Sequence, residues 1–169
     1  MKIGQNRMKW LLPVVVCLLL AGCDFTVPLT GKPETAIDKQ AVGLWERVLP
    51  DGDTERLLVM VLNEREYVLC WPKGAGTELF ARAHLFEYSG RTLVQLQWFG
   101  NSEGAAPDDD RVFQIAAYSV AGDVLEIRML NSDVTGKDFR SSGELARAIE
   151  NNHANPALYS DVMIFKRQG

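Results

Sequence analysis

Histidine is scarce in this chain, and the short sequence signatures of several common enzyme classes are missing. The 169 residues include two histidines, which do not form the H-E-x-x-H pattern of a zinc protease. The G-x-S-x-G turn of serine hydrolases, the phosphate-binding P-loop and the dinucleotide-binding glycine fingerprint are also absent. We therefore predict that the protein is not an enzyme and has no catalytic residue, no cofactor and no metal site.

The chain also lacks an apolar run long enough to cross a bilayer. Residues 10–20 are apolar but interrupted at Pro13, whereas a membrane-spanning helix needs about 20 apolar residues. Basic residues precede the run, which is the order found in a secretory signal peptide. This signal is complete whether translation starts at Met1 or at Met8, and the sequence leaves both starts open.

The apolar run ends in the letters LLAGC, of which the last is Cys23. This stretch resembles the lipobox of bacterial lipoproteins, L-[AS]-[GA]-C, at every position. The resemblance implies cleavage between Gly22 and Cys23, a diacylglyceryl thioether on the Cys23 thiol, and acylation of the new amino terminus. Residues 1–22 are then the signal peptide, and the lipid on Cys23 binds the protein to a membrane. More than one acyl chain matters, because a single chain holds a protein only marginally.

Asp24 follows the cysteine directly. In enteric bacteria, an aspartate at this position resembles the sorting signal that keeps a lipoprotein in the inner membrane. The resemblance implies a lipid-anchored protein of the bacterial cell membrane that faces the periplasm. It favours the inner membrane over the outer membrane.

The mature chain is poor in cysteine and in positive charge. Cys17 leaves with the signal and Cys23 carries the lipid, so Cys70 has no partner for an intrachain disulfide. Because it lies in an apolar run, we expect Cys70 to be a buried, unreactive thiol. Removing residues 1–22 takes away three of 18 basic residues and none of 22 acidic residues, which leaves a formal charge of −7. Such an acidic domain argues against nucleic acid as a partner.

The start of the mature chain shows neither strand nor helix periodicity. Residues 24–40 contain Pro28, Gly31, Pro33 and several polar side chains. We predict that residues 23–40 form the lipidated N-terminus and a flexible tether. Residues 41–169 are then a single β-rich domain, which is large enough for one hydrophobic core.

From residue 41 the sequence alternates between apolar and polar residues, with short breaks. In residues 91–99, Val94, Leu96 and Trp98 fall on one face, while Leu93 and Gln95 fall on the other. This alternation is typical of antiparallel strands joined as hairpins. The pattern predicts strands over residues 42–48, 56–63, 66–71, 78–88, 91–99, 111–119, 123–131 and 161–167.

One helix interrupts the strand pattern before the last strand. Ser141 and Glu144 fit the N-cap and N3 positions of a capping box. Leu145 and Ile149 then share one helical face, and the helix should end near residues 151–152. Residues 57–62 are apolar on both faces, so we expect this helix or a partner protein to cover their outer side.

The first predicted strand contains Gly43, Leu44 and Trp45. This G-x-W, together with a late helix before a final strand, resembles the lipocalin and calycin superfamily of small antiparallel barrels. The resemblance implies that Trp45 packs across one end of the barrel beneath Arg167. We predict a mainly β fold, an antiparallel meander of about eight strands closed as a small lipocalin-like barrel. A two-layer sandwich is the alternative.

Aromatic side chains are the candidate ligand-binding residues of this domain. Trp45, Trp71 and Trp98 are expected either in the packed core or along the wall of a cavity. Our first hypothesis is therefore a membrane-anchored envelope lipoprotein that acts as a small binding module for an apolar ligand. The alternative is a non-catalytic accessory protein that docks on an envelope protein complex.

Overall fold

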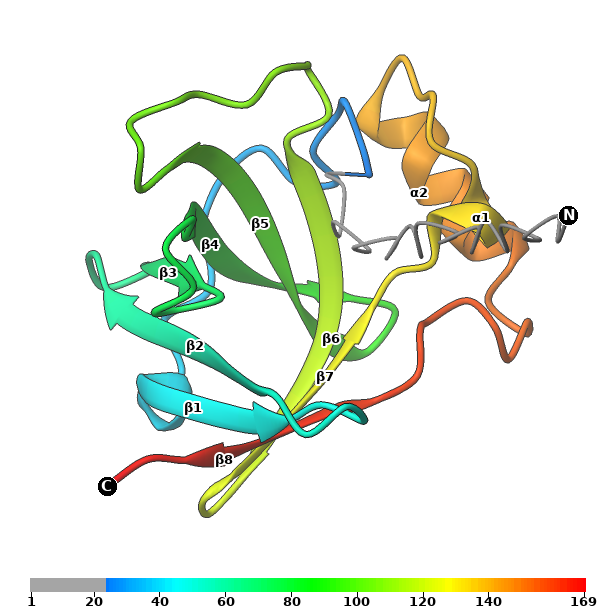
Figure 1. Cartoon of the computed structure of the whole chain (residues 1–169). Coiled ribbons are helices and arrows are strands. Elements are labelled where there is room, and N and C mark those ends of the chain that lie inside the picture. Colours follow the sequence, from blue (N-terminus) through cyan, green and yellow to red (C-terminus); the bar gives the residue numbers. More distant parts are fainter. Residues whose placement is uncertain (1–23) are drawn as a thin grey trace, which may run out of the picture.

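The computed structural model describes residues 24–169. The predicted signal peptide, its cleavage site at Gly22 and the lipidation site at Cys23 lie outside the described residues. Strands dominate the described chain, and two short α-helices precede the last strand (Figure 1). In order, the elements are η1 (Lys39–Ala41), β1 (Gly43–Val48), β2 (Thr54–Val61), β3 (Glu66–Trp71), β4 (Leu79–Tyr88), β5 (Arg91–Asn101), β6 (Phe113–Ala121), β7 (Val124–Met129), α1 (Ser132–Thr135), α2 (Ser142–Asn151) and β8 (Met163–Arg167).

These strands close into one antiparallel barrel. Each strand pairs with the next along the chain, and β8 returns to pair with β1 through Trp45 and Arg167. The meander, the barrel and the helix before the last strand are therefore confirmed. The sandwich alternative is wrong, because the pairing of β8 with β1 closes the sheet on itself and leaves no open edge between two layers.

The connections between strands alternate between the two ends of the barrel, because successive strands are antiparallel. One end, called here the loop end, carries residues 49–53, 72–78, 102–112 and the long segment 130–162. The other end, called here the floor, carries η1, the short hairpin turns and the C-terminus. The two ends therefore differ in character, with long connections at one and tight turns at the other.

The barrel interior is the first of two apolar clusters. The inward-facing side chains of β5 are Val94, Leu96 and Trp98, which confirms the face predicted from the sequence. Other inward-facing side chains come from every strand. The buried members of the interior are Trp45, Leu57, Val59, Tyr67, Leu69, Ala81, Ala83, Leu85, Leu96, Trp98, Leu125 and Phe165.

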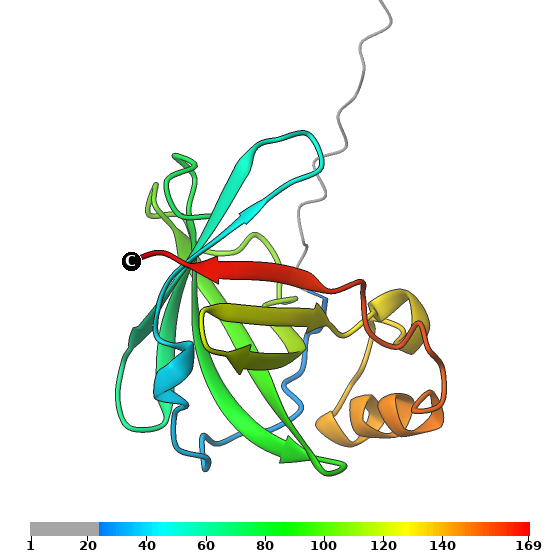
Figure 2. The same cartoon turned by 90° about the horizontal axis from the view of Figure 1, so that it is seen from below.

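The second cluster, called here the outer core, lies outside the barrel wall. α2 and the N-terminal segment pack there against the outer face of β4, β5 and β6, and Figure 2 shows α2 beside the barrel. Its buried members are Phe25, Phe86, Leu93, Ile115, Leu130, Leu145, Ile149 and Leu158.

The expectation that α2 covers residues 57–62 is wrong. Met60 and Leu62 remain 39% and 45% exposed, because the apolar face of α2 packs in the outer core instead.

The start of α2 follows the predicted capping pattern. The Ser141 side chain accepts a hydrogen bond from the Glu144 backbone N–H at 3.3 Å. The Glu144 carboxylate reaches back one residue further than expected and accepts from the Arg140 N–H at 2.8 Å. α1 was not predicted; its N-cap is Asn131, whose side chain accepts from the Asp133 N–H at 3.0 Å.

The segment predicted as a tether lies on the barrel wall instead. Phe25 is fully buried and forms an antiparallel bridge with Phe113. Further along, the buried Gln95 side chain accepts hydrogen bonds from the N–H groups of Leu29 and Thr30 at 2.6 and 3.1 Å, and its amide donates to the Thr30 carbonyl. We call residues 24–38 the strap. It runs across the outside of the barrel because Phe25, Val27 and Leu29 complete the outer core.

Candidate binding site

The barrel interior contains two adjoining apolar cavities. The cavity in the floor half has a volume of about 60 Å³, and the cavity in the loop-end half has about 80 Å³. Four side chains border both cavities: Leu57, Leu69, Val94 and Ile127. The interior is therefore neither hollow along its length nor fully packed.

Two of the three predicted tryptophans meet at the larger cavity. The rings of Trp71 and Trp98 lie 6.5 Å apart and line its wall at the loop end. The Trp98 indole N–H donates to the Gln114 side-chain oxygen at 2.9 Å. The Trp71 indole nitrogen is buried and has no hydrogen-bond partner among the described residues. An indole N–H beside an apolar cavity offers a ligand one directional contact.

The third tryptophan, Trp45, closes the floor and borders neither cavity. The Arg167 guanidinium lies 4.1 Å from the centre of its ring, which confirms the predicted contact. Arg167 also donates to the carbonyls of Val42 and Gln40 at 2.8 and 2.6 Å. Gly43 has a positive φ of 141°, and a Cβ at this position would lie 2.7 Å from Arg167 Nη1. The G-x-W glycine therefore makes room for the arginine.

Two tyrosines line the smaller cavity above the floor. The Tyr67 hydroxyl donates to the Asp38 carbonyl and accepts from the Asp38 N–H, which ties the strap to the barrel wall. Burial raises the pKa of Tyr67 to about 12. Burial likewise raises the pKa of Tyr118, and the nearby Asp38 carboxylate adds to that shift. Both phenols therefore remain neutral at physiological pH.

A charged pair lies inside the barrel at the loop end. Arg47 and Glu55 form a salt bridge across β1 and β2, and their side chains are only 20% and 15% exposed. The Arg47 guanidinium stands 5.2 Å from the centre of the Phe165 ring, and Phe165 borders the larger cavity. Sequence reasoning missed this pair. The alternation of side chains along a strand could have revealed it, because Arg47 shares a face with Trp45 and Glu55 shares a face with Leu57.

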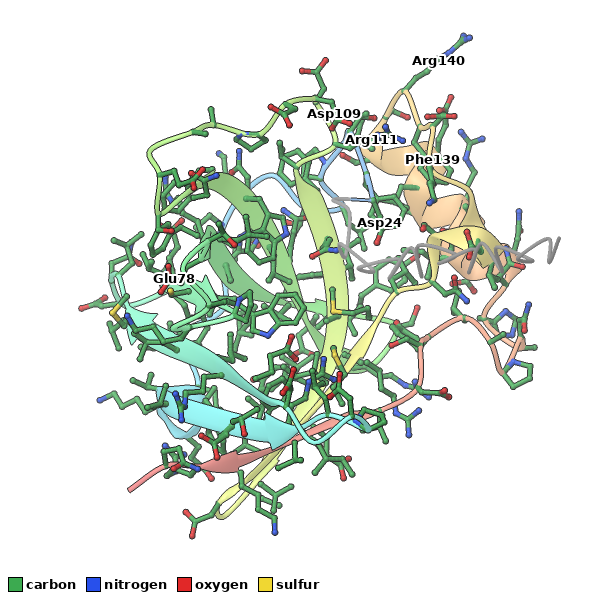
Figure 3. All side chains as sticks on the ribbon, viewed as in Figure 1. Asp24, Glu78, Asp109, Arg111, Phe139 and Arg140 are labelled. Carbon is green, nitrogen blue, oxygen red and sulfur yellow. The ribbon has the colours of Figure 1, made fainter. Side chains whose placement is uncertain are left out.

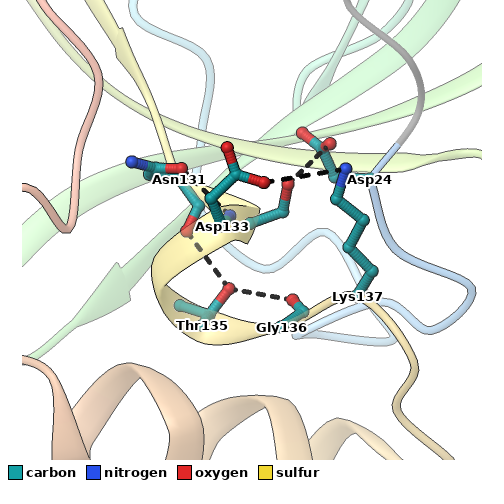
Figure 4. Close-up of polar contacts among 7 residues, drawn as sticks. Asp24, Asn131, Asp133, Thr135, Gly136 and Lys137 are labelled. Carbon is teal, nitrogen blue, oxygen red and sulfur yellow. Dashed lines mark hydrogen bonds and ion pairs between the residues drawn. The ribbon is translucent and has the colours of Figure 1, made fainter.

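Asp24, the predicted sorting residue, is held at the loop end by the fold. Its carboxylate accepts a hydrogen bond from the Ser132 hydroxyl at 2.9 Å (Figure 4) and has a second side-chain hydrogen bond with Gln114. Burial raises the pKa of Asp24, against the lowering effect of the Ser132 hydrogen bond and the Lys137 charge. Gln114 therefore connects this carboxylate to Trp98 in the wall of the larger cavity.

Cys70 and His84 both face outward from the barrel wall rather than into the cavities. Cys70 is 2% exposed, and burial raises the pKa of its thiol, in agreement with the predicted buried cysteine. Burial lowers the pKa of His84, whose Nε2 has no partner among residues 24–169. Neither side chain borders the candidate site.

The described chain contains no cluster of three or more histidine, cysteine, aspartate or glutamate side chains placed to hold a metal ion. In the acidic loop 102–112, Asp109 forms a salt bridge with Arg111 at 3.0 Å (Figure 3). Within residues 24–169, no helix is both long and apolar enough to cross a bilayer.

No protein-family model, no curated protein and no solved structure matches this chain. The candidate site must therefore be interpreted from its own geometry. Drug-sized ligands occupy pockets of about 300–1,000 Å³, whereas a cavity of about 150 Å³ lined by apolar side chains accepts a benzene-sized molecule. Each cavity is smaller than the second class, but the adjoining volumes of about 60 and 80 Å³ together approach it. The interior is therefore suited to a small apolar molecule or a short segment of an acyl chain.

Proposed function

We propose that the protein is a bacterial lipoprotein that binds a small apolar ligand inside its barrel. The observation that carries the binding function is the pair of adjoining apolar cavities. Empty apolar volume costs stability, on the order of 24 cal/mol per Å³. A cavity of about 80 Å³ therefore costs on the order of 2 kcal/mol, and a bound ligand restores the lost contacts.

The larger cavity is the proposed binding site, because it has more volume and borders Trp71, whose indole N–H has no partner among the described residues. Trp71, Met129 and Met163 are all half-buried at the loop end. Methionine side chains are flexible, so they can move aside for a ligand. The Trp71 indole N–H, the Gln114 amide and the Arg47–Glu55 pair are the polar groups nearest this end. They suit a ligand with an apolar body and a small polar end.

The proposed anchor is the lipid on Cys23. The lipobox ending at Cys23 supports acylation, and Asp24 supports retention in the inner membrane with the domain in the periplasm. Incorporation of radiolabelled palmitate tests this part, with Cys23→Ser as the unlabelled control. Separation of inner and outer membranes then tests the proposed location. Recovery of the protein in the outer membrane contradicts it.

Ligand binding is tested by titrating the purified protein with straight-chain fatty acids of increasing length and with indole. We expect a saturable change in tryptophan emission, because Trp71 and Trp98 border the cavity. The change should be strongest for the shortest apolar probes, because the cavity is small. The variant Ala116→Val adds two methyl groups inside the larger cavity and should weaken binding about tenfold, or 1.4 kcal/mol. Ala117→Val is the matched control, since Ala117 faces the outer core. Binding that is absent, or equally weakened by both variants, contradicts the proposal.

A second candidate function is docking on an envelope protein. Met60, Val61 and Leu62 at the floor end of β2 are 39%, 52% and 45% exposed, and no helix of the described chain covers them. Met60→Glu and Leu62→Glu should abolish a specific crosslink to a partner in intact cells while leaving ligand binding unchanged. A crosslink that persists in both variants counts against this surface.

A further inference from the structure

The strap leaves almost no free chain between the barrel and the proposed lipid. The N–H groups of Asp24 and Phe25 both donate to the Phe113 carbonyl, at 3.2 and 3.1 Å, and the Phe113 N–H donates back to Phe25 at 3.0 Å. Adjacent Cα atoms lie about 3.8 Å apart. The residue that carries the lipid is therefore one peptide bond from a residue held by the barrel. A free tether of residues 24–40 would instead reach up to about 55 Å.

Asp24 is held by its side chain as well as by its backbone. The Ser132 hydroxyl of α1 donates to its carboxylate at 2.9 Å. Figure 4 shows Asp24 beside α1. The neighbouring Phe25 ring packs in the outer core, with its centre 6.1 Å from that of Phe139. The Thr26 hydroxyl donates to the Phe139 carbonyl at 3.1 Å. Three consecutive residues of the strap are thus attached to α1 and to the segment between α1 and α2.

This attachment lies at the loop end of the barrel. Phe113 is the first residue of β6, and β6 starts at the loop end. Ser132 follows β7, which finishes at the same end. Figure 3 shows Asp24 on the same side of the molecule as Asp109 and Arg111 of the loop 102–112. β6 has nine residues, each rising about 3.3 Å, so the floor is on the order of 25 Å further from the anchor.

We propose that the strap holds the loop end of the barrel against the bilayer in which the lipid on Cys23 is inserted. The inference rests on the proposed lipidation. A lipid one residue from Asp24 cannot reach a bilayer at the floor without releasing the strap and exposing Phe25. Full exposure of a phenylalanine costs about 1.5–3 kcal/mol, which favours the attached state.

The loop end also carries side chains that suit a bilayer surface. Val48 at the end of β1 is 71% exposed, and Phe99 near the end of β5 is 49% exposed and stacks on Phe80 at 6.3 Å. Asp108 and Asp110 in the loop 102–112 are exposed carboxylates. They disfavour anionic headgroups, so we assign the contact to the headgroup layer of a zwitterionic bilayer, such as phosphatidylethanolamine.

In this orientation, the larger cavity lies on the side of the barrel that faces the bilayer. The half-buried wall of the larger cavity, with Trp71 and Met163, lies at the same end as Asp24. A ligand dissolved in the bilayer can then enter the barrel from the headgroup layer.

The test compares two exposed valines at opposite ends of the barrel. Val48→Cys places a thiol at the loop end, and Val61→Cys places one at the floor, where Val61 is 52% exposed. The native Cys70 is 2% exposed and should not react under native conditions. Each full-length, lipidated variant is labelled with a thiol-reactive fluorophore and reconstituted in phosphatidylethanolamine vesicles that contain nitroxide-headgroup lipids. We expect loss of emission from the label at position 48 and unchanged emission from the label at position 61.

A glycine–serine insertion between Cys23 and Asp24 is the matched control. About 12 such residues span roughly 20 Å as a flexible coil, so the two labels should then be quenched equally. Protein that sediments with the vesicles but shows equal quenching without the insertion overturns the orientation alone. Protein that carries no acyl chain by mass spectrometry, and stays in the aqueous phase, overturns both the orientation and the proposed anchor.

Discussion

The barrel interior and the outer core are built from similar side chains but are packed differently. Both cavities lie in the interior, and none of the residues that border them belongs to the outer core. The outer core instead joins segments far apart in sequence, from Phe25 in the strap to Leu145 and Ile149 in α2. The outer core is therefore packed without either cavity, whereas the interior keeps the unfilled volume in which we propose that a ligand binds.

The floor and the loop end of the barrel also differ in how tightly they are held together. At the floor, Arg167 ties the strand that closes the barrel to two carbonyls and to the Trp45 ring. At the loop end, half-buried methionines and the long connections leave the larger cavity close to the surface. The floor is therefore held by specific polar contacts, whereas the loop end is where we propose that a ligand enters.

The largest expected effect on stability comes from removing Phe25, the buried aromatic side chain of the strap. Phe25→Ala should lower the free energy of unfolding by about 3–5 kcal/mol, because Phe25 is fully buried in the outer core. Urea unfolding followed by circular dichroism measures the change. Phe99→Ala is the control and should cost much less, about 1 kcal/mol, since Phe99 is half exposed. Similar costs for the two variants would show that the strap contributes little to stability.

Two buried leucines compare the clusters directly. Leu145 in the outer core is fully buried, and Leu125 beside the smaller cavity is 3% exposed. We expect Leu145→Ala to cost about 4 kcal/mol and Leu125→Ala about 2–3 kcal/mol. The reason is that a side chain beside a void already lacks contacts on one side. Denaturant midpoints at equal m-values test the order, and the reverse order contradicts the loose packing of the interior.

Ala116 and Ala117 are consecutive on β6 and allow side-chain volume to be added to either cluster, instead of removed. Ala116→Val fills part of the larger cavity and should raise the free energy of unfolding by about 0.5–1 kcal/mol. Ala117→Val places the same methyl groups in the outer core and should lower it by about 1 kcal/mol through overpacking. Thermal unfolding monitored by calorimetry reports both. A loss of stability in both variants would mean that the cavity cannot accept the added methyl groups.

The smallest expected effect concerns the charge at the start of the strap. Burial raises the pKa of Asp24, so the folded state binds a proton more tightly than the unfolded state. Stability therefore falls as pH rises from the unfolded pKa through the folded pKa, and the cost of the buried charge is complete above that window. Asp24→Asn removes this cost and should gain less than about 1 kcal/mol near pH 7, since the site is partly exposed and screened.

The gain from Asp24→Asn should disappear near pH 3.5, where an unperturbed aspartate with a pKa of about 3.9 is mostly protonated. Urea unfolding of both proteins at the two pH values makes the measurement. An Asp24→Asn variant that is less stable than the parent protein at neutral pH would show that the attraction of Lys137 and the Ser132 hydrogen bond outweigh burial.

Much of the fold follows from local patterns. Alternation over residues 91–99 indicated the inward face of β5, and the capping pattern at Ser141 indicated the first turn of α2. These features depend on neighbours within a few residues, which a sequence displays directly. Four features escaped prediction, namely α1, the strap, the Arg47–Glu55 pair and the side of the barrel on which α2 packs. The strap and the place of α2 depend on which outer surface is left uncovered once the barrel closes, whereas the Arg47–Glu55 pair lies within the β1–β2 hairpin and was overlooked.

Local sequence was sufficient for the strands, for the hairpins that join them and for the place of the late helix along the chain. Periodicity and capping suffice for these features, because each involves only residues near one another along the chain. Folding, in contrast, was needed to show that the interior has cavities and that residues 24–38 are attached to the wall. Volume left unfilled and surface left uncovered are properties of many side chains at once, so they exist only after the chain has folded.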